Sequence, residues 1–184
     1  TPVIFENKVY LLSHEGDLYA LNATDGKILW SLNVISDLAG VRPDWGYSGC
    51  PLVVEGKIII ETGSPEGSLV ALDSKNGSVV WRGGGHEAGY ASPVLRKSAP
   101  SEILIFNQFG LSVHDLENGQ EVKSYQHKTR FGVNAAQPLD LGSNVLISSA
   151  YGKGAALVNL NGSNPQAIWE SEAISCQMAS LVYQ

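Results

Sequence analysis

Charged residues are scarce in this chain, and long apolar runs are absent. Asp, Glu, Lys and Arg make up 16% of its 184 residues and hydrophobic residues 43%, which favours a packed core over a disordered chain. The 12 Lys and Arg residues form no cluster, so we expect no nucleic-acid partner and no binding to an anionic membrane surface. No apolar stretch approaches the roughly 18 to 20 residues that cross a bilayer, so we expect no membrane insertion.

The sequence contains two cysteines, which argues against a domain stabilised by zinc or by several disulfides. Cys50 and Cys176 lie far apart and show no CxxC or Cys/His spacing, so we expect neither a zinc site nor a small domain held by disulfides. We interpret both residues as buried thiols. The pair His86-Glu87 lacks a second histidine at helical spacing, and we predict no metal site there either.

An internal repeat with a period of roughly 42 to 51 residues dominates the sequence. The segments 18–30, 69–81 and 111–123 align with one another, and a degenerate copy runs from 157 to 169. Each copy is preceded by a proline that opens a short apolar run: Pro2, Pro51, Pro93 and Pro138. A fixed period of this length is typical of propeller blades.

Each repeat divides into four short runs of β type. Proline at the start of the first run costs no hydrogen bond of the ladder, and Asp25-Gly26, Asn76-Gly77 and Asn118-Gly119 supply the positive φ of tight hairpin turns. One such meander buries little surface alone, whereas radial stacking covers both faces of each sheet. We therefore predict an all-β fold, a β-propeller in which four four-stranded antiparallel blades form part of a ring.

The blades are expected at residues 1–47, 48–89, 90–134 and 135–178 of a single domain, and residues 179–184 are expected to begin a fifth. An open arc of blades leaves strand edges unpaired, which proteins normally avoid. We therefore interpret the chain as an excerpt whose ring is completed by the remaining blades of a longer chain. The alternative is that a second copy of this chain closes the ring.

A large side chain recurs at one position near the end of each repeat. Trp30, Trp81 and Trp169 share this position, and the third repeat has Lys123 there, with Tyr125 two residues further on and on the same side of the strand. A buried indole removes about 150 to 250 Å² from water, worth roughly 4 to 6 kcal/mol as an upper bound. We predict that the four aromatic residues are wedges between blades.

Two segments carry a resemblance to a known family. Residues 20–30 and 71–81 resemble the AxDxxxGKxxW motif of pyrroloquinoline-quinone-like (PQQ-like) repeats, and residues 130–138 and 147–157 are similar to a bacterial subgroup described as polyvinyl-alcohol-dehydrogenase-like. The resemblance implies a toroid of seven or eight blades, as in quinoprotein dehydrogenases and the outer-membrane assembly lipoprotein. It also implies export, to the periplasm or the cell exterior.

The connectivity of a four-stranded meander sorts its loops between two ends. The first and third turns share one end, while the second turn and the connection between blades share the other, which we name the long-loop face. Polar and aromatic residues on these longer loops are our candidate binding residues: Trp45, Tyr47, His86, Glu87, Tyr90, Arg130, Asn134 and Tyr151. Such groups on one face suit a polar ligand. The alternative for each is loop packing or hydrogen bonding to loop backbone.

Two functions compete at this point. A clear repeat without a recognisable catalytic set favours a binding or scaffold propeller that engages a protein, peptide or glycan through its long-loop face. The alternative, implied by the resemblance, is a quinoprotein alcohol dehydrogenase with PQQ and calcium as cofactors. No adjacent cysteine pair is present, and no catalytic or calcium-binding residue of that family can be matched here residue by residue. A third possibility is an accessory or sensor module of a larger protein.

Overall fold

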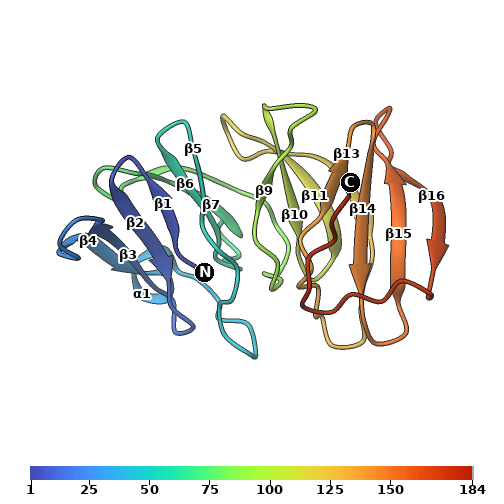
Figure 1. The fold of residues 1–184 in the computed structure, drawn as a ribbon, viewed down its shortest axis with the longest axis horizontal. Coiled ribbons are helices and arrows are strands. Elements are labelled where there is room, and N and C mark those ends of the chain that lie inside the picture. Colours follow the sequence, from blue (N-terminus) through green and yellow to red (C-terminus); the bar gives the residue numbers. More distant parts are fainter. Residues whose placement is uncertain (184) are drawn as a thin grey trace.

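The protein is an arc of four four-stranded antiparallel sheets (Figure 1). The structure is a computed structural model that describes residues 1–183; Gln184 lies outside the described residues. In every sheet the strands are ordered as they occur in the chain, so each sheet is a simple meander. The predicted all-β propeller architecture is confirmed.

Each blade has a first strand of two or three residues followed by three strands of five or six. Blade 1 contains β1 (Val3–Phe5), β2 (Lys8–Leu12), β3 (Asp17–Asn22) and β4 (Ile28–Asn33). Blade 2 contains β5 (Leu52–Val54), β6 (Lys57–Glu61), β7 (Leu69–Asp73) and β8 (Val79–Gly83). Blade 3 contains β9 (Val94–Leu95), β10 (Glu102–Phe106), β11 (Gly110–Asp115) and β12 (Glu121–Gln126). Blade 4 contains β13 (Leu139–Leu141), β14 (Asn144–Ser149), β15 (Gly154–Asn159) and β16 (Gln166–Ser171).

The first strands form the inner side of the arc. β1 contacts β5, and β5 contacts β9, whereas the fourth strands form the outer edges of the sheets. Buried side chains of the middle strands fill the space between neighbouring blades, such as Tyr10 with Ile58 and Ile60, and Leu104 with Val145. The core is therefore divided among the blade interfaces.

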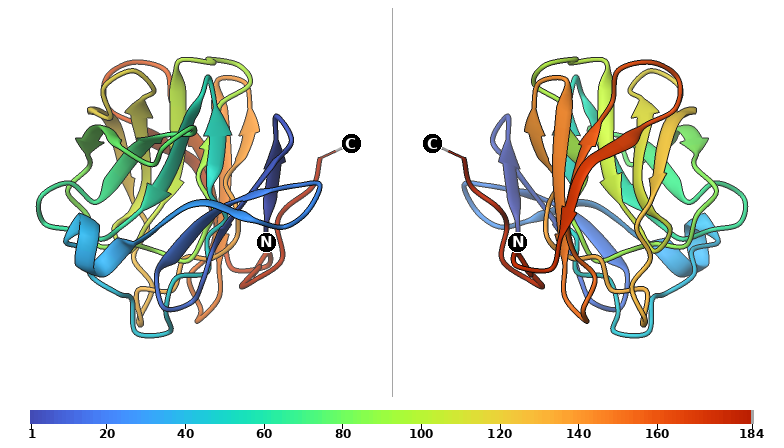
Figure 2. Two further views of the ribbon diagram at one scale, coloured as in Figure 1. Left: turned by 90° about the vertical axis from the view of Figure 1, so that its left-hand side faces the viewer. Right: turned by 90° about the vertical axis from the view of Figure 1, so that its right-hand side faces the viewer.

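One short helix, α1 (Val34–Leu38), lies where the sequence predicted only a loop. The side chain of Asn33 caps it by accepting hydrogen bonds from the backbone N–H groups of Ile35 and Ser36. Figure 2 shows this helix at the edge of the molecule, beyond the end of β4. Its buried residues Val34 and Leu38 belong to the first core cluster, so the helix anchors the connection from blade 1 to blade 2.

The indoles of the first two blades lie against the glycine turn of the next blade. Trp30 Nε1 donates a hydrogen bond to the carbonyl of Ser74 at 3.3 Å, and a Cβ placed on Gly77 would lie 2.9 Å from the Trp30 ring. Because Gly77 has a φ of +75°, both its backbone conformation and its contact exclude a side chain. Trp30 therefore lies between blades, as a wedge should.

The same contact recurs between blades 2 and 3. Trp81 Nε1 donates to the carbonyl of Leu116 at 3.1 Å, and the indole lies over Gly119, whose φ is +73°. In blade 3 the residue at the indole position is Lys123, and its Nζ donates to the carbonyl of Leu160 at 2.8 Å. The lysine thus makes the hydrogen bond that the indole makes in blades 1 and 2.

The neighbouring aromatic residues differ in their surroundings. Tyr125 packs against the second core cluster, and its hydroxyl donates to Glu170 at 2.5 Å, so it also spans blades 3 and 4. Trp169 remains 37% exposed on the last sheet of the arc. No strand is assigned within residues 179–183, so the start of a fifth blade stays a prediction.

Replacement of Trp81 by alanine is expected to lower the free energy of unfolding by about 3 to 5 kcal/mol, because it empties a blade interface and leaves the Leu116 carbonyl unpaired. Val80→Ala is the matched control and should cost clearly less, because Val80 is next to Trp81 on β8 but is already half exposed to water. Urea unfolding followed by circular dichroism measures both. Equal losses would contradict the wedge role of Trp81.

Candidate functional site

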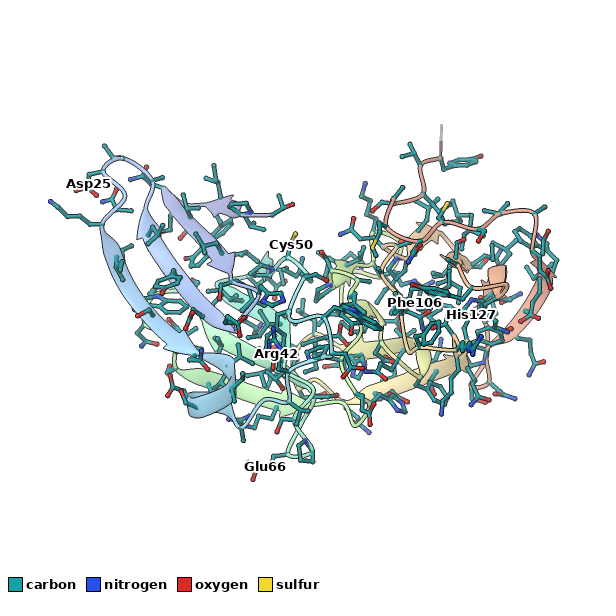
Figure 3. The ribbon with its side chains drawn as sticks, turned by 90° about the horizontal axis from the view of Figure 1, so that it is seen from below. Asp25, Arg42, Cys50, Glu66, Phe106 and His127 are labelled. Atoms are coloured by element: carbon teal, nitrogen blue, oxygen red, sulfur yellow. The ribbon has the colours of Figure 1, made fainter. Side chains whose placement is uncertain are left out.

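The turns between second and third strands and the connections between blades gather at one end of the arc, which is the long-loop face. Backbone hydrogen bonds join these loops to one another, including Tyr47 N–H to the carbonyl of His14 at 3.0 Å and Tyr90 N–H to the carbonyl of Asn134 at 2.9 Å. In Figure 3, Arg42 lies near the middle of the arc, far from the turn at Asp25. The loops therefore form a continuous surface across the blades.

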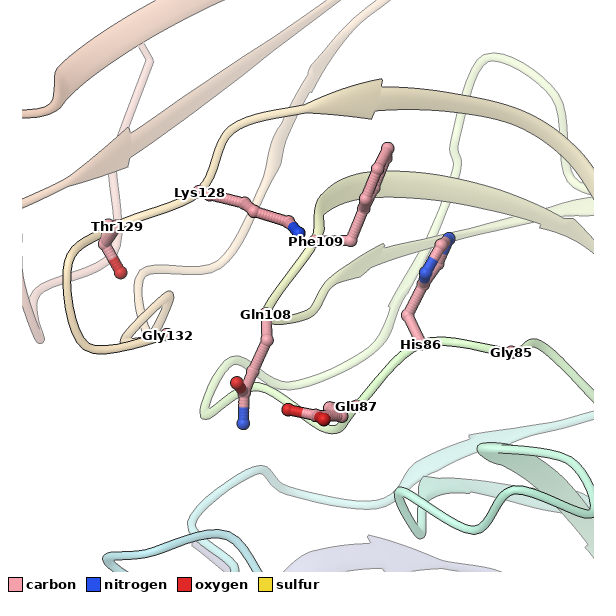
Figure 4. A pocket seen from close by; sticks show the side chains of 8 residues that line it. All are labelled: Gly85, His86, Glu87, Gln108, Phe109, Lys128, Thr129 and Gly132. Atoms are coloured by element: carbon pink, nitrogen blue, oxygen red, sulfur yellow. The ribbon is translucent and has the colours of Figure 1, made fainter.

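His86 and Glu87 line a polar pocket on this face (Figure 4). The pocket has a volume of about 370 Å³ and is lined by Gly85, His86, Glu87, Gln108, Phe109, Lys128, Thr129 and Gly132. The His86 ring stacks on Phe109 with 4.4 Å between ring centroids, and Lys128 Nζ lies 6.0 Å from the centroid of the same phenyl ring. One wall is thus a stacked pair of rings, and Lys128 is close to it.

The His86 side chain is held by residues that the sequence analysis did not identify. Its Nε2 lies 3.2 Å from a carboxylate oxygen of Glu121 on β12, and the same oxygen lies 3.9 Å from Nε2 of His114 on β11. His114 Nδ1 lies 3.0 Å from the carbonyl of Gly119. A carbonyl only accepts, so Nδ1 carries the proton. Burial lowers the pKa of His114, which keeps this imidazole neutral.

Trp45, Tyr90 and Tyr151 lie in a second, mainly apolar depression on the same face, which we name the aromatic hollow. Its volume is about 350 Å³, and it is lined by Trp45, Ser48, Tyr90, Val133, Tyr151 and Met178. The Trp45 and Tyr90 rings are 5.9 Å apart. Trp45 is 55% exposed, Tyr151 45% and Met178 69%, whereas Tyr90 and Val133 are buried, so exposed side chains surround a buried floor.

Arg130 lies beside this hollow. Its guanidinium carbon is 5.2 Å from the centroid of the Phe131 ring, and Phe131 meets Tyr151 edge to face at 5.1 Å. Phe131 is itself half exposed. Arg130 and Phe131 therefore extend the aromatic surface beyond the hollow and add a positive charge at its edge.

Tyr47 and Asn134, in contrast, are buried and bind loop backbone. Tyr47 donates its hydroxyl hydrogen to the carbonyl of Thr62 at 3.0 Å, and burial raises its pKa to about 12. Asn134 is fully buried; its amide nitrogen donates to the carbonyls of Asn107 and His127, and its amide oxygen accepts from Ser149. These contacts correspond to the alternative of loop packing.

A third depression, which we name the inner groove, begins at the aromatic hollow and lies beside the first strands of the blades. Its volume is about 470 Å³, and it is lined by Thr1, Ser48, Cys50, Tyr90, Ser92, Ala135, Gln137, Met178 and Ser180. It shares Ser48, Tyr90 and Met178 with the hollow. Cys50 and Cys176 are free thiols, as expected, but they are only partly buried, so the expectation that both are buried was wrong.

Glu61, at the end of β6, is an ionisable group that the sequence analysis missed. It lines a small cavity together with Cys50, Tyr47 and Gly89. Burial raises the pKa of Glu61 to about 8, although the backbone N–H of Gly89 acts in the opposite direction. The carboxyl group therefore stays protonated in the folded protein up to neutral pH.

A quinone held with a metal ion needs a group of ligating side chains. Within residues 1–183, no group of three or more His, Cys, Asp or Glu side chains is placed to hold a metal. The inner groove presents hydroxyl, thiol and amide groups and no carboxylate, whereas calcium prefers carboxylate and carbonyl oxygens. The lining of the inner groove therefore does not fit a calcium ion held by carboxylates. The one helix of this part of the chain has five residues and is too short to span a membrane.

Comparison with known proteins gives one family and several relatives. The family model described as outer membrane protein assembly factor BamB matches residues 1–183. The dehydrogenase subunit of the quinone alcohol dehydrogenase of Gluconacetobacter polyoxogenes is 36% identical over 84 residues, which cover 42% of this chain and 11% of that protein. Outer membrane protein assembly factor BamB of Salmonella typhimurium is 31% identical over 85 residues, covering 44% of this chain and 20% of that protein.

A solved structure supports the fold alone. The crystal structure of the computationally designed Ika8 protein aligns with a TM-score of 0.66 at 14% identity, covering 100% of this chain and 52% of that one. The matched segments are about a tenth and a fifth of the length of the two curated relatives.

Glu61→Gln is expected to change how stability depends on pH. Because the folded state raises the pKa of Glu61 from 4.5 to about 8, the folded protein holds a proton that the unfolded chain releases, so stability declines as the pH rises from about 4.5 through 8. The glutamine variant removes this contribution and should gain on the wild type from about pH 5 to about pH 9. Urea midpoints at several pH values measure it. Glu66→Gln, on an exposed loop, is the control, and parallel curves for wild type and Glu61→Gln would refute the prediction.

Proposed function

The chain belongs to the family of outer membrane protein assembly factor BamB, and on that premise we propose that it is a non-catalytic binding propeller that engages a partner protein through its long-loop face. The observation that carries the proposal is the aromatic hollow on that face. The proposal includes export to the periplasm or the cell exterior, which the words "outer membrane" in the family description support.

The exposed side chains around the hollow have the composition of a protein interface. Trp45, Phe131, Tyr151 and Met178 are all exposed, and Arg130 lies beside them. Trp, Tyr, Phe, Met and Arg are the residues enriched in protein interfaces. A group of exposed apolar side chains with a polar rim marks an interaction site, because water contact with it is unfavourable.

A protein or peptide suits this surface better than a glycan does. Among the residues that line the hollow, Trp45, Ser48, Tyr90 and Tyr151 have side chains that can form hydrogen bonds. Three of these already have protein partners: Ser48 Oγ donates to the carbonyl of Tyr90, and the hydroxyls of Tyr90 and Tyr151 accept from the backbone N–H of Trp45 and from Gln177 Nε2. A sugar carries a hydroxyl on most of its carbons and needs many such partners to replace water. An apolar side chain of a partner protein needs none and gains from burial.

The arc itself supports a further part of the proposal, which concerns completion of the ring. Trp169 is partly exposed at the position where Trp30 and Trp81 contact the following blade. At the other end of the arc, a side chain at Gly26 would meet nothing, whereas Gly77 and Gly119 lie against indoles. Further blades, or a second copy of the chain, would cover both surfaces.

Photo-crosslinking tests the proposed protein partner. A benzoylphenylalanine at position 45 or 151, in the chain exported to a bacterial periplasm, should form adducts with a defined partner protein. The matched control is the same group at position 80, because Val80 is exposed on the outer strand β8 and does not line the hollow. Equal adducts at all three positions would indicate non-specific contact and would refute the proposal.

The crosslinked partner, once purified, allows a quantitative prediction. Trp45→Ala and Tyr151→Ala should each weaken binding roughly 10-fold to 100-fold, because exposed aromatic residues at the centre of an interface commonly contribute about 1.4 to 2.8 kcal/mol. Calorimetric titration measures the dissociation constants. Val80→Ser should bind like the wild type. An unchanged affinity in both hollow variants would show that the partner contacts another surface.

A further inference from the structure

The inner groove is built from two repeat positions that face the same side of the arc. The residue directly before each blade-opening proline lines it in every blade, and Ser180 adds to this set: Thr1, Cys50, Ser92, Gln137 and Ser180. The residue two positions earlier forms a second row, with Met178 in the corresponding place before Ser180: Ser48, Tyr90, Ala135 and Met178. Extended backbone has a side-chain period of two, which accounts for the shared direction.

The groove and the aromatic hollow form one continuous site. Ser48, Tyr90 and Met178 line both depressions, whose volumes are about 470 and 350 Å³. Together they exceed the space that a single side chain fills and lie in the range of sites that enclose a whole ligand, roughly 300 to 1,000 Å³. The site therefore has an apolar, aromatic outer part and a polar inner part.

The polar part carries no ionised side chain. Its hydroxyl and amide groups can donate and accept hydrogen bonds, and the Cys50 backbone N–H already donates to the Ser92 hydroxyl at 2.8 Å. A charged ligand group would lose hydration here without a countercharge from a side chain, whereas neutral peptide groups would find partners.

We propose that the aromatic hollow and the inner groove together receive an extended, uncharged segment of the partner protein, with one large apolar side chain in the hollow and the following backbone along the groove. The inference rests on the proposed function and names the kind of segment that it binds. Met178, which is 69% exposed and unbranched, is suited to adjust to apolar side chains of different shape.

Cys50 provides the readout, because its thiol lines the groove and Cys176 can be replaced by serine without altering the lining. Burial acts to raise the pKa of Cys50, and its hydrogen bond with Ser92 acts to lower it. The thiol is only partly buried, so a small reagent can reach it. The rate of labelling by methyl methanethiosulfonate is measured in the Cys176→Ser chain, alone and with capped five-residue peptides of sequence GSFSG, GSESG and GEFEG.

The GSFSG peptide should slow the labelling of Cys50, about 5-fold at a concentration of about four times its dissociation constant. GSESG, which lacks the apolar anchor, and GEFEG, which carries charge into the groove, should leave the rate unchanged. Trp45→Ala and Gln137→Glu should each abolish protection by GSFSG, whereas Val80→Ser should retain it, because Val80 lies on the outer strand β8.

Three results would overturn the inference. Equal protection by all peptides would remove the requirement for an uncharged segment, and failure of the reagent to label Cys50 at all would show that the groove is closed. Protection by PQQ with calcium, but by no peptide, would assign the groove to a cofactor. Crosslinking at position 45 together with an unprotected Cys50 would retain the proposed function and reject only the groove as its peptide site.

Discussion

The contact between an indole and the glycine turn of the next blade is the interaction on which the arc depends. It requires three features at once: a large flat side chain on the fourth strand, a residue without Cβ opposite it, and a backbone carbonyl that accepts the indole hydrogen. Trp30 with Gly77 and Trp81 with Gly119 satisfy all three. Because a single four-stranded meander buries little surface, these contacts are needed to hold neighbouring sheets together.

The architecture was predictable because its signals are local and repeated. Proline before the first strand and Gly in the third turn specify backbone geometry within a few residues, and the period shows how the units follow one another. The role of Lys123 was not predictable, since a lysine opposite a carbonyl of the next blade is a tertiary contact. The helix α1 escaped prediction because its five residues carry one capping signal, Asn33, and no helical period.

The location of the candidate site followed from connectivity, whereas its composition did not. A meander places its second turn beside the connection to the next blade, so the long-loop face could be identified from the sequence. Tyr47 and Asn134 could not be separated from Trp45 and Tyr151, because burial depends on how neighbouring loops lie against one another. Glu121 was missed for a similar reason: it is distant from His86 in sequence and reaches it from the outer strand of the next blade.

In each repeat, the residues that stabilise the contact with the next blade and the residues that line the groove occupy different positions. At the position that contacts the next blade, blades 1 and 2 have an indole that lies over a glycine. Blade 3 has Lys123 there, which donates a hydrogen bond to the carbonyl at the corresponding place in blade 4. Positions directly before the prolines differ in every blade, from hydroxyl to thiol to amide. The stacking of the blades that buries the indoles also aligns the residues before the prolines. These equivalent positions therefore form a groove without an additional loop. The side chains at these positions can therefore vary to suit a ligand without loss of the contacts between blades. This is the physical basis for placing ligand recognition on the inner side of the arc.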